Sequence, residues 1–309
     1  MNRYTHVIGW GIGTPERVLT NDELSRTLDT SDAWIVERTG IKERRIGGST
    51  KSLAVEASTK AMEVAGVNPE DIDLLILATT TPDRTIPATS VTVQEALGLS
   101  CGAMDINAAC SGFVYGLSMA HGQILAGANR VLLIGAETLS RFLDWEDRST
   151  AVLFGDGAGA VVLEASDKPG GLLSYTMHAD GSLEHLIYCD IPGTIFMKGR
   201  EVFRKAVQAM EDACREALQK ADCSIDDISL LIPHQANIRI INTAAERLGI
   251  GSEKIAEVLS WTGNTSSASI PTALVDAVEK GRVADGDLLL LAGFGAGMTS
   301  AGAVLKWGA

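Results

Sequence analysis

The sequence predicts an α/β fold built from two similar halves, and three observations support this prediction. Residues 65–76 resemble residues 221–232 at an offset of 156 positions (227 − 71), about half of the 309-residue chain. Apolar residues upstream of both segments recur at helical spacing. Turn and strand patterns then follow in the same order downstream. One repeat of this length indicates a duplicated α/β unit, since solenoid repeats span only about 20–50 residues.

Each copy of the repeat reads as the end of a helix, an acidic turn and a short buried strand. Upstream of the first copy, Leu53, Ala57, Ala61 and Val64 mark one helical face. Upstream of the second copy, residues 201–220 predict an amphipathic helix.

The repeat continues to the end of each half. Residues 129–135 and 285–291 read as turns entering buried strands, and residues 159–163 and 302–305 close the two halves. No linker or low-complexity tract separates them. We therefore expect one compact body with an N-terminal half, 1–165, and a C-terminal half, 166–309.

Composition excludes several classes of protein. The chain is 46% hydrophobic and 21% charged, as in ordinary globular proteins, and no apolar stretch approaches the roughly 18 residues that a membrane span requires. Five irregularly spaced cysteines do not resemble a disulfide framework, and neither they nor the histidines form a metal-binding motif. With a net charge of −13, the chain should repel nucleic acid and anionic membranes. We expect a cytosolic protein that needs no metal.

Cys110 is the first candidate for chemistry. An extended run through residues 104–109 turns through small residues into an apolar helix that begins near Phe113. A thiol at a helix N-terminus gains a thiolate-stabilising field, which predicts a lowered pKa and a ready nucleophile. A single cysteine is nevertheless more often a small buried apolar residue.

His234 and Asn264 are the second and third candidates. His234 follows the second repeated strand, and in open α/β sheets ligands bind at such carboxyl ends. Asn264 lies in a polar turn that enters another helix. The 156-residue offset maps Cys110 onto Ser266, so the loops carrying Cys110 and Asn264 should face each other across a pseudo-twofold axis.

These segments, with residues 30–35, 38–41 and 154–159 and the pattern of the whole chain, resemble β-ketoacyl-acyl-carrier-protein synthase III. This family initiates bacterial fatty-acid synthesis. The resemblance implies a thiolase-like αβαβα five-layered duplicated fold and a homodimer. It also implies decarboxylative condensation of an acyl-CoA primer with malonyl-acyl-carrier protein to a β-ketoacyl product, without a cofactor.

The resemblance assigns roles to particular residues. The family's catalytic triad maps onto Cys110, His234 and Asn264, and backbone N–H groups of Cys110 and Ala296 would hold the oxyanion. The remaining assignments are Thr30, Trp34, Arg38, Arg148 and Asn237 for CoA, with Trp34 and Arg148 enclosing the adenine; Arg204, Arg239 and Arg247 for the carrier protein; and Ile86 for the partner subunit's acyl pocket. Ile86 replaces a phenylalanine of short-primer relatives, which predicts longer or branched primers.

Several alternatives stay open at this point. A related enzyme of a specialised, polyketide-like pathway would have the same residues. A cysteine hydrolase would release free acid, whereas a degradative thiolase would need a second cysteine after Cys223. A nucleotide-binding module is suggested by Gly9, Gly11 and Gly13, but this glycine pattern is incomplete and a strand followed by a turn explains it better.

Overall fold

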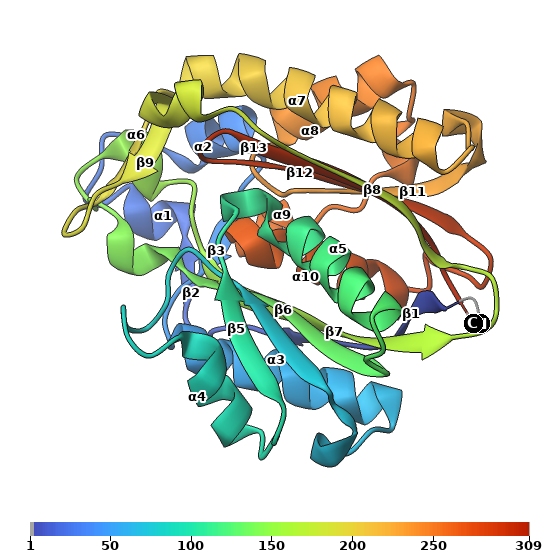
Figure 1. Cartoon of the computed structure of the whole chain (residues 1–309). Helices are drawn as coiled ribbons and strands as arrows, with labels where there is room; N and C mark the ends of the chain where they lie inside the picture. Colours follow the sequence, from blue (N-terminus) through green and yellow to red (C-terminus); the bar gives the residue numbers. More distant parts are fainter. Residues whose placement is uncertain (1–2, 309) are drawn as a thin grey trace.

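Nine strands form one continuous sheet whose two parts enclose a pair of helices. The computed structural model describes residues 3–308, and its strands follow the order β11-β12-β13-β8-β1-β7-β6-β4-β5 (Figure 1). The strands are β1 (Tyr4–Gly13), β4 (Leu74–Ala78), β5 (Gly102–Ile106), β6 (Arg130–Thr138), β7 (Asp156–Ser166), β8 (Gly171–Ala179), β11 (Ile228–Pro233), β12 (Leu288–Gly295) and β13 (Thr299–Lys306).

The two parts of the sheet repeat one topology. β4 runs parallel to β6, β6 is antiparallel to β7, and β7 is antiparallel to β1. β11, β12, β13 and β8 follow one another with the same relative directions. Thr5 of β1 pairs with Gly171 of β8 and joins the two parts. The predicted duplicated α/β fold is therefore confirmed, whereas the division at residue 165 stays a prediction.

The helices complete five layers. α5 (Gly112–Leu125) and α10 (Ser269–Glu279) lie between the two parts of the sheet, as Figure 1 shows. α3 (Thr50–Ala65) and α4 (Thr89–Ala96) cover one outer face, and α7 (Gly199–Lys220) and α8 (Ile238–Leu248) cover the other. The central helices begin at the middle of the molecule, where the candidate site lies.

The repeated acidic turns have the same hydrogen bond. Asp71 Oδ2 accepts from the backbone nitrogen of Asn68 at 2.8 Å, and Asp227 Oδ2 accepts from that of Ser224 at 2.8 Å. Each turn is a short 3₁₀ helix that leads into β4 or β11. The similarity read from the sequence thus extends to the level of single bonds.

The predicted helical faces are confirmed with one exception. The second helix spans Gly199–Lys220 and buries Ala206, Met210 and Ala217. In α3, however, Val64 is 49% exposed, so its assignment to the buried face is wrong. The buried residues of α3 recur at four-residue steps, and the next step falls on Ala65 rather than on Val64.

The glycines of β1 serve packing. A Cβ atom at Gly9, Gly11 or Gly13 would lie 2.1, 2.4 or 2.2 Å from a backbone carbonyl oxygen of α3. Only glycine lets the strand and the helix approach this closely. The pattern that suggested a nucleotide-binding module is therefore explained by contact between β1 and α3.

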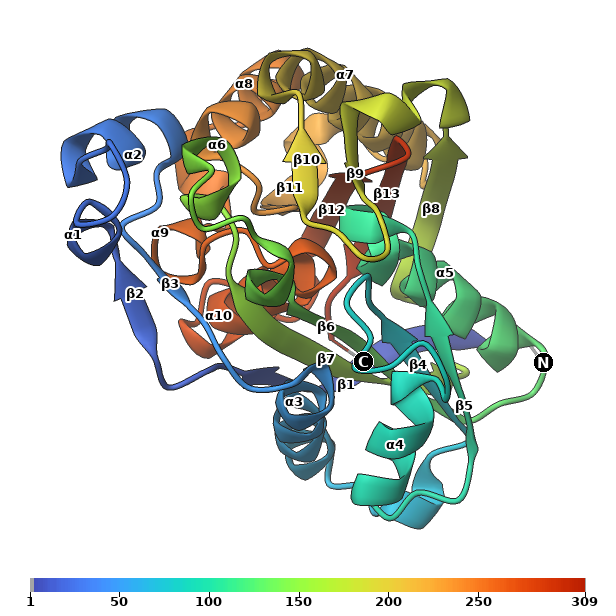
Figure 2. The same ribbon diagram turned by 90° about the vertical axis from the view of Figure 1, so that its left-hand side faces the viewer.

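The remaining strands and α-helices are short. They are β2 (Val18–Thr20), α1 (Asn21–Leu24), α2 (Asp32–Thr39), β3 (Glu43–Arg45), α6 (Arg148–Ala151), β9 (Ile187–Cys189), β10 (Ile195–Met197) and α9 (Leu259–Thr262). Of these, α1, α2, α6 and β9 lie on the side of the molecule that faces the viewer in Figure 2. Within residues 3–308, no helix is both long enough and apolar enough to cross a membrane.

Candidate active site

Cys110 lies at the start of the central helix α5. It occupies a single 3₁₀ turn, Ala109–Ser111, that runs directly into Gly112 of α5. The preceding Ala109 has φ 47°, a left-handed conformation that is costly for a residue with a Cβ atom. The predicted position near a helix N-terminus is confirmed.

The predicted lowering of the Cys110 pKa is wrong. Burial raises the pKa of the thiol to about 12, and the negative charge of Glu137 acts in the same direction. The side chain is only 9% exposed, and loss of hydration destabilises a thiolate. Position relative to a helix can be read from the sequence, but depth of burial cannot. The Cys110 side chain is therefore a thiol at neutral pH.

This pKa predicts the pH dependence of alkylation. Well below its pKa, a thiol gains thiolate about tenfold per pH unit, so Cys110 should react with iodoacetamide about tenfold faster at each step from pH 7 to pH 9. Peptide mass spectrometry resolves this site from the other cysteines. A rate that levels off below pH 8 would contradict the raised pKa.

His234 follows the last residue of β11 and is 1% exposed. Its Nδ1 lies 2.6 Å from Ser269 Oγ, which accepts a hydrogen bond from the backbone nitrogen of Gln235. Within residues 3–308, the Ser269 hydroxyl has no other partner, so it donates to Nδ1 and leaves the ring hydrogen on Nε2. Burial lowers the pKa of His234 to about 3. The ring is therefore a neutral donor.

The loop around His234 is fixed by Gln235, a residue that the sequence analysis did not single out. Its amide nitrogen donates to the backbone oxygens of Pro233 and Ala256, and its oxygen accepts from the backbone nitrogens of Val258 and Leu259. These four bonds bury a polar side chain completely without leaving it unsatisfied. They hold His234 at the carboxyl end of its strand.

Asn264 is held by its backbone and side-chain oxygen. Its backbone nitrogen donates to the oxygen of Leu153, and its backbone oxygen accepts from Gly155. Its Oδ1 accepts from the backbone nitrogen of Ser266 at 2.9 Å. The Nδ2 donor is consequently free to face the neighbouring cavity.

The two loops are related as predicted, with a shift of one residue. Ser266, with φ 48°, corresponds to Ala109, and the 3₁₀ turn Ser266–Ala268 enters α10 as Ala109–Ser111 enters α5. Cys110 therefore corresponds to Ser267, not to Ser266 as the sequence offset indicated. The starts of α5 and α10 show which residues of the two loops are equivalent. The offset of 156 was taken from segments further upstream, and it misses the one-residue difference in the length of chain between those segments and the helices.

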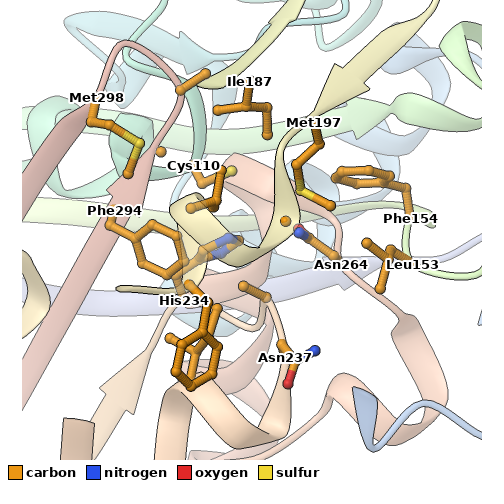
Figure 3. Close-up of a pocket in the computed structure, with 17 residues that line it drawn as sticks. Cys110, Leu153, Phe154, Ile187, Met197, His234, Asn237, Asn264, Phe294 and Met298 are labelled. Atoms are coloured by element: carbon orange, nitrogen blue, oxygen red, sulfur yellow. The ribbon is translucent and has the colours of Figure 1, made fainter. Parts of the chain in front are cut away.

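Cys110, His234 and Asn264 line one pocket (Figure 3). Asn237 and Ala296 also line this pocket. The other lining side chains are mostly apolar and include Leu153, Phe154, Ile187, Met197, Val202, Phe203, Ile240, Phe294 and Met298. Three polar side chains thus converge in an apolar pocket, an arrangement typical of a site for a ligand with an apolar chain.

The loop after β12 closes against the nucleophile. A Cβ atom at Gly295 would lie 2.5 Å from the backbone nitrogen of Cys110, so glycine is required for this approach. Ala296 follows and lines the pocket beside Cys110. Both backbone segments assigned to an oxyanion hole therefore meet at the cavity.

Three of the residues assigned to CoA, Trp34, Arg38 and Arg148, contact one another, and Asn237 links them to the lining of the pocket. The guanidinium carbons of Arg38 and Arg148 lie 4.5 and 4.8 Å from the centre of the Trp34 ring. Asn237 donates to the backbone oxygen of Arg38 at 2.9 Å. The side-chain oxygen of Thr30 is buried without a hydrogen-bond partner among the described residues. Because Arg148 rests directly on Trp34, an adenine between them requires Arg148 to move.

Ile86 and the three surface arginines lie apart from this pocket. Ile86 is 85% exposed in the loop between β4 and α4. Arg204 of α7 and Arg239 of α8 are exposed on adjacent helices. Arg247 is also exposed, but it contacts Glu211 at 3.5 Å, so part of its charge is already compensated.

The apolar lining of the pocket and three polar supports, Glu137, Gln235 and Ser269, were not predicted from the sequence. Met197 and Phe203 illustrate the difficulty, since apolar residues in short strands and helices look like ordinary core. Glu137 is completely buried next to the catalytic loops, although its type is usually exposed.

Comparisons with known proteins agree with this geometry. Family models described as 3-oxoacyl-[acyl-carrier-protein (ACP)] synthase III and its C-terminal part match residues 104–181 and 218–307. A β-ketoacyl-[acyl-carrier-protein] synthase III from Roseiflexus castenholzii is 48% identical, with both chains covered completely.

Solved structures agree over the same length. The 3-oxoacyl-[acyl-carrier-protein] synthase III of Aquifex aeolicus superposes with a TM-score of 0.97 at 49% identity, covering 98% of this chain and 100% of that one. The priming β-ketosynthase of the R1128 polyketide pathway has a TM-score of 0.94 at 37% identity, covering 99% and 96%. The chain therefore belongs to the 3-oxoacyl-[acyl-carrier-protein] synthase III family of acyltransferases.

Proposed function

We propose that this chain condenses an acyl-CoA primer with malonyl-acyl-carrier protein, using Cys110 as the nucleophile and His234 and Asn264 as hydrogen-bond donors. The observation that carries this proposal is the convergence of a cysteine with two uncharged donors in one apolar pocket. The product is a β-ketoacyl-acyl-carrier protein and the reaction initiates fatty-acid synthesis.

In the first step, Cys110 sulfur attacks the thioester carbonyl of acyl-CoA. The carbonyl oxygen becomes negative and accepts hydrogen bonds from the backbone nitrogens of Cys110 and Ala296. The bond between the carbonyl carbon and the CoA sulfur then breaks, and the proton lost by the Cys110 thiol ends on CoA. The acyl group stays on Cys110.

In the second step, the malonyl unit loses carbon dioxide. The electron pair of the broken carbon–carbon bond passes into an enolate, whose oxygen accepts from His234 Nε2–H and Asn264 Nδ2–H. Because burial keeps the His234 pKa near 3, the ring stabilises this oxygen without bringing the extra proton of an imidazolium that would quench the carbanion. The enolate carbon attacks the acyl carbonyl, and the bond from that carbon to the Cys110 sulfur breaks. Cys110 leaves as a thiolate and takes a proton from water.

The substrates and these three side chains account for every bond change, so the proposal includes no metal or redox cofactor. Thr30, Trp34, Arg38, Arg148 and Asn237 bind CoA. An acidic carrier docks on Arg204 and Arg239, with a smaller contribution from Arg247. This local basic surface is needed because the net charge of −13 opposes association at long range.

Intact-protein mass spectrometry tests the reaction directly. Incubation with acetyl-CoA should add the mass of one acetyl group, and subsequent malonyl-carrier should remove that mass and yield a β-ketoacyl-carrier. A cysteine hydrolase would instead release free acid and form no carbon–carbon bond. Release of acetate without condensation would overturn the proposal.

Loss of a CoA contact should affect substrate binding alone. Arg148→Ala is expected to raise the KM for acyl-CoA about tenfold with little change in kcat, since the contact is equal in ground and transition states. Initial rates over a range of acyl-CoA concentrations provide the measurement. Arg130→Ala is the control, because Arg130 starts β6 and pairs with Glu164 at 2.7 Å. A fall in kcat at unchanged KM would contradict the assignment.

Ile86 provides a test of primer choice and of the homodimer. In the proposed dimer its exposed side chain enters the partner's pocket, where isoleucine leaves more room than phenylalanine. Acetyl-, isobutyryl- and octanoyl-CoA should therefore load at comparable rates, and Ile86→Phe should slow octanoyl-CoA about tenfold or more. Preference for longer primers favours a specialised pathway. Strict acetyl preference in the unmodified chain would remove this assignment.

A further inference from the structure

Glu137 is a completely buried carboxyl group close to both catalytic loops. It lies near the end of β6 and is 0% exposed. Within residues 3–308, no basic side chain forms an ion pair with it. Burial raises the pKa of Glu137 above its ordinary value, while hydrogen bonds oppose that rise. Burying a carboxyl group destabilises the folded protein unless hydrogen bonds compensate for the lost hydration.

The N-terminal half supplies several of its hydrogen-bond donors. The hydroxyl groups of Thr79, Thr80 and Thr81 donate to Oε2 at 3.2, 3.0 and 2.7 Å. The backbone nitrogen of Thr80 donates to the same oxygen at 3.0 Å. Thr79, Thr80 and Thr81 form the turn after β4, so all three residues of this turn are hydrogen-bonded to one carboxylate oxygen.

The C-terminal half supplies further donors to Oε1, which also accepts from the Thr80 backbone nitrogen at 3.2 Å. Ser267 Oγ lies 2.8 Å from Oε1, and the Ser267 backbone nitrogen lies 3.4 Å from it. The single hydrogen of the Ser267 hydroxyl is shared between Oε1 and the backbone oxygen of Ala78, which is also 2.8 Å away. Glu137 and Ser267 therefore connect the two halves of the molecule at one point.

Ser267 directly follows Ser266, the residue that orients the Asn264 side chain. Ser266 has the strained φ of 48°, and its backbone nitrogen holds Asn264 Oδ1 at 2.9 Å. A Cβ atom at Gly135 of β6 would lie 2.3 Å from the backbone oxygen of Ser267, so the strand presses closely on this segment. The strained turn persists only if its neighbours fix it.

The same segment also abuts the loop of the nucleophile. A Cβ atom at Gly112, two residues after Cys110, would lie 3.4 Å from the Ser267 Cβ. A shift of Ser267 therefore changes the distance between the Asn264 amide and the Cys110 sulfur. Small displacements of this kind matter because catalysis depends on sub-ångström placement of the reacting groups.

We propose that Glu137 is a positioning residue that joins the turn after β4 to the Ser266–Ser267 segment and thereby fixes the Asn264 amide opposite Cys110. The inference rests on the roles proposed above for Cys110 and Asn264. Glu137 itself touches no substrate. It acts on the decarboxylation step, in which Asn264 donates, and has no direct part in acyl loading.

A carboxylate suits this position because almost every neighbouring group is a donor. An ionised carboxylate only accepts, with two oxygens that serve several donors at once. A glutamine of the same shape would place an NH₂ group against the donors of the Thr79–Thr81 turn or against the backbone nitrogen of Ser267, which is also a donor. Glu137→Gln therefore loosens one side of the connection while preserving volume.

The test measures malonyl-carrier decarboxylation and acetyl transfer to Cys110 separately in the Glu137→Gln variant. We expect kcat for malonyl-carrier decarboxylation to fall about 10- to 100-fold, with KM and the rate of acetyl transfer to Cys110 changed less than about threefold. Radiolabelled carbon dioxide reports the first rate and intact mass the second. Ser267→Ala should show the same split, and the double variant should lose less than the product of the two single effects.

Asp105→Asn is the matched control. Asp105 accepts from the backbone nitrogens of Thr89 and Ser90 at 2.8 and 2.7 Å, and both of these residues belong to α4 of the N-terminal half. Its substitution should lower the melting temperature without splitting the half-reactions.

Each outcome separates the inference from the proposed function. In Glu137→Gln and Ser267→Ala, acyl transfer and decarboxylation could fall by the same factor, and this factor could match the fraction of protein that is unfolded. That result would show a structural role only. Unchanged decarboxylation in both folded variants would also overturn the inference. If the unsubstituted chain formed no adduct on Cys110, the proposed function itself would fail.

Discussion

Cys110→Ala is expected to abolish the acyl adduct and to lower the condensation rate by at least about 10⁴-fold, because among residues 3–308 no other cysteine lines the pocket. Intact-protein mass spectrometry with acetyl-CoA and a coupled assay of β-ketoacyl-carrier formation measure the two effects. The large expected loss follows from covalent catalysis, in which removing the nucleophile removes the whole pathway.

Cys214→Ala is the matched control for this substitution. Cys214 lies in α7, is 0% exposed, and burial raises its pKa to about 12, as it does for Cys110. The two thiols thus share burial and basicity and differ in position, since only Cys110 borders the pocket. An adduct that persists in Cys110→Ala, or disappears in Cys214→Ala, would contradict the assignment.

His234→Ala and Asn264→Ala should each lower the rate of malonyl decarboxylation about 10²- to 10³-fold, because each removes one donor from the developing enolate oxygen. Acyl transfer to Cys110 should continue in both variants. The double variant should lose less than the product of the single effects, since both donors serve one oxygen. Carbon dioxide release and adduct formation are measured on the same preparations.

Ser269→Ala tests the role of the hydrogen bond between Ser269 and His234, because it removes this bond and leaves the imidazole ring in place. Its hydroxyl directs the ring hydrogen to Nε2 through Nδ1, at 2.6 Å. Without it, part of the population adopts the other tautomer, and we expect a smaller loss of about tenfold in decarboxylation. Equal decarboxylation rates in His234→Ala and the unsubstituted chain would contradict the donor role.

The duplicated architecture could be predicted from the sequence because turns and buried strands leave local signals. Asp71 and Asp227 stand in matching turns, and the same chemistry gives both the same hydrogen bond. Cys110, His234 and Asn264 were candidates from their positions in the sequence and were grouped by the resemblance, but their convergence on one pocket required coordinates. Spacing alone placed Cys110 one residue away from its true counterpart, since loop residues follow no period.

Properties that depend on burial were predicted less well. The helix start near Cys110 correctly located the thiol, but the pKa follows hydration, which distant residues exclude. Glu137 and Ser269 gave no signal because their meaning comes from partners far along the chain. Trp34 and Arg148 were assigned to opposite sides of an adenine, but in the structure they contact each other directly, and this contact depends on side-chain conformations that sequence does not encode locally.

The place of β1 in the sheet has a consequence for synthesis on the ribosome. Although it is the first strand to be made, it lies between β7 and β8, and its partners are residues 158–166 and Gly171. More than half of the polypeptide must emerge before the middle of the sheet can close. Such long-range pairing slows folding, and the early apolar segments must meanwhile avoid wrong partners. Delayed closure is the kinetic cost of joining both halves through the first strand.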